Sequence, residues 1–199
     1  MMLGLWSDEG MTTLYLFCSA APPALEVADV IADAQARGWD VCLGLTPSAH
    51  RWLEPEVDEL EGLTGHAVRS SYKLPGEPDE WPTADAILVA PATFNTVNEW
   101  ALGLTSKFVV GVVAEAIGKR IPTVAMPCAN AAYVQHPQFD RSLDVLRAAG
   151  VSVLYGPGGF EPNQPGERRA EGFPWGIALD EVGRIILSAS QPLCERESD

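Results

Sequence analysis

The sequence predicts an α/β domain in which helices cover both faces of a central parallel sheet. Residues 86–90 form a wholly apolar run, which is typical of a strand buried on both faces. Along the rest of the chain, apolar segments of strand length alternate with segments of helical periodicity, and short Gly- or Pro-containing stretches separate them. This alternation favours the right-handed parallel crossovers from which doubly wound sheets are built.

The individual elements follow from the same patterns. Strands are expected over residues 13–19, 40–45, 86–90, 121–126 and 151–155. Helices are expected over residues 23–37, 56–63, 140–149 and 177–188, with one or two more over residues 95–119. Gly38 and Gly150 follow two of these helices, where glycine commonly ends a helix. Residues 72–83 are rich in proline and are expected to form a loop.

The composition indicates one globular domain, expected over residues 12–190. The chain has 199 residues, of which 47% are hydrophobic and 20% charged, and its mean hydropathy is close to zero. Residues 1–11 and 191–199 are expected to be flexible termini. No apolar run reaches the roughly 18 to 20 residues of a membrane helix, and the first residues lack a basic start, so a cytoplasmic protein is expected.

Charge and cysteine content exclude several classes of function. A net charge of −14 and a pI near 4.5 repel nucleic acid and anionic lipid, so neither is an expected partner. The four cysteines are far apart and form no Cys-x-x-Cys pair, which argues against a disulfide framework or a zinc site. No metal site is therefore expected.

The segment over residues 156–176 is longer than a usual connection in a compact α/β domain. Phe160, Phe173 and Trp175 give it apolar anchors, and Arg168 and Arg169 are suited to an anionic substrate. One interpretation is therefore a flap over a ligand pocket. The other is a surface loop whose aromatic side chains pack on the protein's own body.

Small polar residues follow four of the predicted strands. The clusters are Ser19-Ala20-Ala21, Thr46-Pro47-Ser48-Ala49, Ala90-Pro91-Ala92-Thr93-Phe94-Asn95-Thr96 and Pro127-Cys128-Ala129-Asn130. Parallel sheets bind ligands at the carboxyl ends of their strands, and these clusters carry no charged side chain. Together they predict a pocket for a flat neutral ring with a phosphate tail, although each alone also fits a turn or a helix cap. No Gly-x-Gly-x-x-Gly dinucleotide fingerprint is present.

On these four clusters, followed by Tyr133-Val134 and Pro137, the chain resembles the homo-oligomeric flavin-containing cysteine decarboxylases. That family includes phosphopantothenoylcysteine decarboxylases and the peptidyl-cysteine decarboxylases of lanthipeptide biosynthesis. The resemblance covers about residues 12–155, and its most specific element is Ala-Pro-Ala-Thr-x-Asn-Thr at residues 90–96. It implies a flavodoxin-like (Rossmann-like) three-layer sandwich with a central parallel sheet.

The resemblance also implies a cofactor and an assembly. In the family these segments bind FMN, which implies Ser19 and Ser48 near the phosphate and Thr93, Asn95 and Thr96 near the ribityl chain or the ring. The other residues implied at the cofactor are Ala20, Thr46, Ala90, Ala92, Cys128 and Ala129. Family members commonly form trimers or dodecamers with the flavin at a subunit interface. The aromatic residues expected at such an interface are Trp100, Phe108 and Tyr133.

Two departures from the family pattern concern the catalytic groups. Family decarboxylases carry a catalytic histidine shortly before the strand that leads into Ala-Pro-Ala-Thr, and residues 68–84 of this chain contain none. Tyr72 and His66 are the candidate bases in its place, although a surface or capping role for His66 is the competing interpretation. The flexible clamp of phosphopantothenoylcysteine decarboxylases contains a cysteine, and residues 156–176 contain none.

The expected function is therefore an FMN-dependent oxidative, decarboxylase-like enzyme. Its substrate is expected to be a small molecule or peptide with a cysteine-derived thiol or a carboxylate, which Asn130 would hold through its side-chain amide. The alternative is a non-catalytic FMN-binding carrier, sensor or assembly partner. A flavin prenyltransferase is a third possibility, but the sequence carries none of its basic phosphate-binding pattern.

Overall fold

The computed structural model describes residues 11–166 and 172–190. Its centre is a five-stranded parallel sheet with the order β2-β1-β3-β4-β5. The strands are β1 (Thr12–Cys18), β2 (Trp39–Leu45), β3 (Ala86–Ala92), β4 (Thr123–Pro127) and β5 (Ser152–Val153). This is the flavodoxin-like strand order, so the predicted α/β class and parallel sheet are confirmed.

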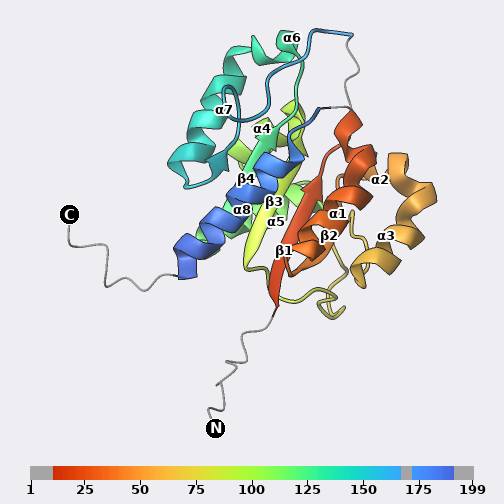
Figure 1. Cartoon of the computed structure of the whole chain (residues 1–199). Coiled ribbons are helices and arrows are strands. Elements are labelled where there is room, and N and C mark those ends of the chain that lie inside the picture. Colours follow the sequence, from red (N-terminus) through yellow and green to blue (C-terminus); the bar gives the residue numbers. More distant parts are fainter. Residues whose placement is uncertain (1–10, 167–171, 191–199) are drawn as a thin grey trace, which may run out of the picture.

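Helices follow the strands in turn and lie on both sides of the sheet (Figure 1). The α-helices are α1 (Val27–Ala36), α2 (Pro47–Leu53), α3 (Val57–Thr64), α4 (Phe94–Ala101), α5 (Phe108–Lys119), α6 (Ala131–Val134), α7 (Pro137–Ala148) and α8 (Trp175–Ser190). Two short 3-10 helices, η1 (Pro22–Glu26) and η2 (Glu54–Glu56), precede α1 and α3.

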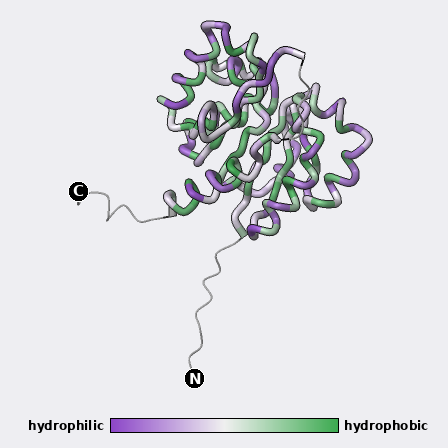
Figure 2. The backbone as a smooth tube through the Cα atoms, turned by 45° about the horizontal axis from the view of Figure 1, so that its top comes forward, coloured by the Kyte–Doolittle hydropathy of each residue, from purple (hydrophilic) through white to green (hydrophobic). Residues whose placement is uncertain are grey.

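Two hydrophobic cores fill the space between the three layers. Side chains alternate across a strand, so Leu14 and Leu16 of β1 enter one core while Phe17 enters the other. The first core joins the sheet to α1, α3 and α8, and the second joins it to α4, α5 and α7. Apolar residues accordingly concentrate in the middle of the molecule and polar ones on the outer helix surfaces (Figure 2).

The structure corrects several predicted element boundaries. The cluster after β2 fits either a turn or a helix cap by its sequence, and no helix was predicted there. Thr46 begins helix α2, and its side chain accepts a hydrogen bond from the amide of Ala49. Over residues 95–119, where one or two helices were expected, the chain forms two, separated at residues 102–107. The last strand is shorter than expected, because after Val153 the chain turns into a bridge between Tyr155 and Phe160.

The long segment after β5 is anchored by its aromatic residues. Phe160, Phe173 and Trp175 are 6%, 6% and 8% exposed and contact one another within the first core. This burial matches the interpretation in which the aromatic side chains pack on the protein's own body. Arg168 and Arg169 lie outside the described residues, as do most residues of the two predicted flexible termini. The flap itself stays a prediction.

No helix in the described part of the chain is both long enough and apolar enough to span a bilayer.

Candidate functional site

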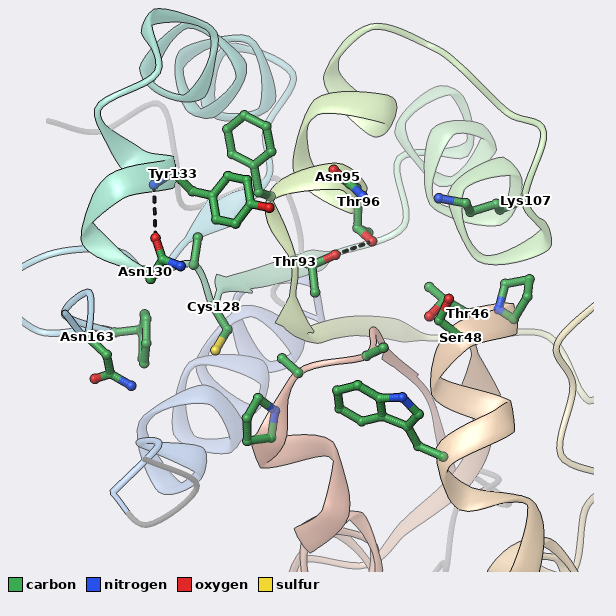
Figure 3. A pocket seen from close by; sticks show the side chains of 18 of the residues that line it. Thr46, Ser48, Thr93, Asn95, Thr96, Lys107, Cys128, Asn130, Tyr133 and Asn163 are labelled. Carbon is green, nitrogen blue, oxygen red and sulfur yellow. Dashed lines mark hydrogen bonds between the residues drawn. The ribbon is translucent and has the colours of Figure 1, made fainter. Parts of the chain in front are cut away.

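A pocket of about 560 Å³ lies at the carboxyl ends of the strands, within the size range of small-molecule sites. It opens where the chain order of the strands reverses, between β1 and β3, which is where doubly wound sheets bind ligands. The loops after β1, β2, β3 and β4 all contribute to its wall (Figure 3). Nine predicted residues line it, namely Ala20, Thr46, Ser48, Thr93, Asn95, Thr96, Cys128, Ala129 and Asn130.

A chain of hydroxyl groups connects two of these loops. Ser19, directly after β1, and Thr96, in the first turn of α4, are each 1% exposed, and their side-chain oxygens lie 2.8 Å apart. Thr96 Oγ1 also lies 3.1 Å from Thr93 Oγ1, which faces the pocket (Figure 3). The Thr93 side chain does not cap α4, so its hydroxyl is not used by the helix amides. These bonds fix the relative position of the loops at the switch point.

Asn130 combines a structural contact with a free polar group. Its Oδ1 accepts hydrogen bonds from the amides of Ala132 and Tyr133 at 3.1 and 3.0 Å, which caps helix α6. Capping uses only the oxygen of the side-chain amide, and the nitrogen end is directed toward the pocket (Figure 3). The Asn130 amide therefore can donate to a ligand while it caps the helix.

Two cationic side chains lie on the pocket wall near the loop after β2. Arg51 donates a hydrogen bond to Ser48 Oγ at 3.3 Å. Lys107, in the loop before α5, donates to both carboxylate oxygens of Glu99 at 2.7 and 2.8 Å. Arg51 thus places a positive charge beside Ser48, whereas the charge of Lys107, which lies near Thr46 and Ser48 (Figure 3), is balanced by Glu99.

The opposite side of the pocket is aromatic and apolar. The rings of Phe94 and Tyr133 lie 5.0 Å apart, and the Tyr133 side chain is 54% exposed. The thiol of Cys128 lies between this side and the strand ends, where burial raises its pKa to about 12. The thiol is therefore neutral at physiological pH.

Five predicted site residues do not line the pocket. Ser19 is buried behind it, and Ala90 and Ala92 are fully buried within β3. His66 Nε2 lies 2.8 Å from Asp40 Oδ1, beside the amino end of β2. His66 is therefore at the opposite end of the strands from the pocket. The Tyr72 hydroxyl donates to the carbonyl of Thr105 at 2.7 Å, on the outer face of α5. A single chain thus brings neither candidate base to this pocket.

The structure also corrects the expectation for two aromatic residues. Trp100 and Phe108 are 2% and 4% exposed and belong to the second core. Side chains already buried within one chain have no surface to offer a second subunit, so these two were wrongly expected at an interface. Tyr133 remains exposed at the pocket.

Several lining residues were missed by the sequence patterns. Arg51, Trp52 and Lys107 lie on or before helices, so they carry no strand-end signal. Phe160 and Asn163 come from the long segment after β5, which one interpretation placed over a ligand pocket without naming either residue as a ligand contact. The carbonyl of Asn163 accepts a hydrogen bond from the amide of Ala131 at 2.7 Å. The helical spacing after Thr46 could have placed Arg51 on the same side as Ser48, three residues earlier.

A doubly wound sheet with a polar pocket at its switch point defines a class of α/β proteins that bind phosphorylated ligands beyond their strand ends. Within that class, the sequence model of the Flavoprotein family matches residues 7–170. The chain belongs to this family, as the resemblance in its sequence implied.

Individual relatives are more distant. A stretch of 100 residues is 30% identical to the coenzyme A biosynthesis bifunctional protein CoaBC of Thermococcus kodakarensis, covering 50% of this chain and 23% of that protein. The chain therefore matches less than a quarter of the length of that relative.

Solved structures share the fold. The FMN-dependent cysteine decarboxylase TvaF from thioviridamide biosynthesis superposes with a TM-score of 0.69 at 22% identity, over 89% of this chain and 99% of that chain. HAL3 from Cryptococcus neoformans superposes with a TM-score of 0.71 at 17% identity, over 92% and 100%.

Proposed function

We propose that this protein binds FMN in the pocket at the carboxyl ends of β1 to β4. The observation that supports this most is the convergence of four separate strand-end clusters on one pocket at the switch point. Membership of the Flavoprotein family and the likeness to an FMN-dependent enzyme agree with this ligand. The phosphate would lie near Ser48 and Arg51, and the ring toward Thr93 and Asn95.

Flavin titration tests this proposal. The purified protein is expected to be yellow, to release FMN on denaturation, and to quench FMN fluorescence when the emptied protein is titrated. Arg51→Ala should weaken FMN binding by roughly 10- to 100-fold, the usual value of a hydrogen bond to a charged group, and should change riboflavin binding little. Arg147→Ala is the control, because Arg147 pairs with Asp144 away from the pocket. A colourless protein that takes up no added FMN would rule the proposal out.

We further propose that the protein is an oxidative enzyme for a substrate with a thiol next to a carboxylate, as at a C-terminal cysteine. Bound FMN would supply the oxidant that takes a hydride from the carbon bearing the thiol, while the thiol proton passes to solvent. The resulting thioaldehyde would lose the neighbouring carboxylate as carbon dioxide and leave an enethiol. The two amide hydrogens of Asn130 would hold that carboxylate while its oxygen caps α6. Tyr133 and Phe94 would form the apolar wall against the rest of the substrate.

Anaerobic mixing with peptides that end in cysteine tests this reaction. Loss of flavin absorbance and release of carbon dioxide are expected with the thiol peptides and not with peptides that end in serine. Asn130→Asp keeps an oxygen that caps α6 but removes both amide donors and adds a negative charge, so it should retain FMN and lose the reaction. Equal rates in wild type and Asn130→Asp would contradict the role of Asn130.

A second candidate function is FMN binding without catalysis, as a carrier, sensor or assembly partner. One observation favours it, because the titratable side chains on the described pocket wall are Arg51, Lys107, Cys128 and Tyr133, with no histidine or carboxylate among them. A base that accepts the thiol proton usually contributes roughly 10²- to 10⁴-fold in rate. Retained FMN binding with an unchanged spectrum across the whole peptide series would support this function over the first.

We propose that the protein forms a homo-oligomer with the pocket at the subunit boundary. Trp52 and Tyr133 both line the pocket and are 47% and 54% exposed, which leaves an aromatic rim in contact with solvent in the single chain. Light scattering should give the mass of a trimer or a multiple of it. Tyr133→Asp should lower that mass, and a monomeric wild type would contradict the assembly.

A further inference from the structure

A second group of polar side chains lies near the amino end of β2, at the opposite end of the strands from the pocket. Asp40 and Cys42 are two residues apart on this edge strand, so their side chains lie on the same face. His66, in the segment after α3, meets them there. One carboxylate oxygen, the Cys42 sulfur and one ring nitrogen of His66 all lie within 4.8 Å of one another.

The contacts of these groups leave the thiol free for a ligand. His66 Nε2 lies 2.8 and 3.0 Å from the two oxygens of Asp40, and both side chains are about one-fifth exposed. Cys42 is fully buried and, within residues 11–166 and 172–190, makes no hydrogen bond. Cys18 on the neighbouring strand is equally buried, but its thiol donates to the carbonyl of Ala90 at 3.0 Å.

We propose that Asp40, Cys42 and His66 bind a divalent transition-metal ion, with Zn²⁺ as the best match. Zn²⁺ takes thiolate, imidazole and carboxylate ligands together, and three protein ligands with one water complete its tetrahedral shell. Mg²⁺ and Ca²⁺ prefer oxygen ligands alone, so a site with sulfur and nitrogen selects against them. Binding releases the thiol proton to solvent and brings the Cys42 sulfur toward His66 and Asp40. The metal takes the place of the hydrogen bond between His66 and Asp40, because both groups then face the ion instead of each other.

The position of the site suggests a structural effect. The backbone of Arg69, three residues after His66, donates to the carbonyl of Leu43 at 3.1 Å and accepts from the amide of Leu45 at 2.8 Å, so it extends the sheet beside β2. A metal that joins His66 to β2 would fasten this segment to the edge of the sheet. The site lies at the opposite end of β2 from Thr46 and the flavin pocket.

Cobalt substitution tests the proposal on the full-length protein. Difference spectra with and without chelator are expected to show the near-ultraviolet band of a thiolate bound to Co²⁺ and visible bands of tetrahedral Co²⁺. Added Zn²⁺ should abolish these bands and raise the melting temperature. A wild-type protein that gives no thiolate band at saturating Co²⁺ would overturn the proposal.

Matched variants locate the metal. His66→Gln and Cys42→Ser should each weaken Co²⁺ binding by at least about tenfold, and Cys42→Ser should also remove the thiolate band. His50→Gln and Cys18→Ser, a histidine and a buried cysteine outside the group, should leave affinity and spectrum unchanged. Circular dichroism confirms that each variant folds. If Cys42→Ser does not fold, an unchanged affinity in folded His66→Gln still refutes the site.

Discussion

The hydroxyls of Ser19, Thr96 and Thr93 form a small network between β1 and β3, where the strand order reverses, and Ser19 and Thr96 are its buried members. Such groups matter to stability mainly when one of them loses its partner, because the remaining hydroxyl then lies buried without a hydrogen bond. Sequence patterns placed all three residues at strand ends, but they could not show that Ser19 is bonded behind the pocket instead of exposed within it.

Thr96→Val is expected to destabilise the protein by about 1–3 kcal/mol, because it leaves the buried Ser19 hydroxyl without its partner. Unfolding in urea, followed by circular dichroism, measures this difference. Thr105→Val is the control. Thr105 is exposed, and within the residues that the structure describes its hydroxyl makes no hydrogen bond. Equal stability of the two variants would contradict a structural role for the network.

Cys128 should be unreactive toward alkylating reagents at neutral pH. Burial raises the pKa of this thiol from 9.0 to about 12, so the reactive thiolate becomes abundant only near pH 12. At pH 8 its alkylation should be slower than that of an ordinary thiol by on the order of a thousandfold. Mass spectrometry of the peptide that contains Cys128 gives the rate against pH. A rate that levels off near pH 9 would show an unshifted thiol.

Helix α5 contains two glycines in different surroundings. A Cβ atom at Gly111 would lie 1.7 Å from the Tyr72 hydroxyl, whereas a Cβ at Gly118 would meet no heavy atom within 4 Å. The segment that carries Tyr72 therefore packs directly on the bare backbone at Gly111. The close approach explains a glycine inside a helix, where it otherwise weakens the structure.

Gly118→Ala is expected to stabilise the protein by about 0.5–1 kcal/mol, since alanine loses less backbone entropy in a helix. Gly111→Ala gains the same propensity but must displace Tyr72 and break its bond to the Thr105 carbonyl, so it should be the less stable of the two. Thermal unfolding compares them. A Gly111→Ala protein as stable as Gly118→Ala would mean that Tyr72 moves away without cost.

The sequence predicted the strands well because a parallel sheet buries both faces, which leaves apolar runs such as residues 86–90. It missed α2 because Pro47 and Ser48 read equally as a turn or as a helix start. It also missed Lys107 and Asn163, which reach the pocket from connections that no local pattern marks. Contacts of that kind depend on how separate segments meet in three dimensions.

The net charge of −14 should make stability depend on salt, because like charges repel one another more in the compact state than in the unfolded chain. The Debye length falls from about 30 Å at 0.01 M to about 8 Å at 0.15 M ionic strength, which screens this repulsion. The melting temperature is therefore expected to rise over that range, equally in NaCl and KCl. A constant or falling melting temperature would show that the favourable ion pairs outweigh the repulsion.

The pocket wall is divided between two parts of the chain. The loops after β1 and β2 precede the long irregular segment over residues 70–85, and the loops after β3 and β4 follow it. The neighbouring strands β1 and β3, whose ends flank the pocket, are therefore contributed by opposite halves. Two fragments cut within that segment would each hold half of the ligand contacts, so recovered flavin binding on mixing would serve as a reporter of their reassociation.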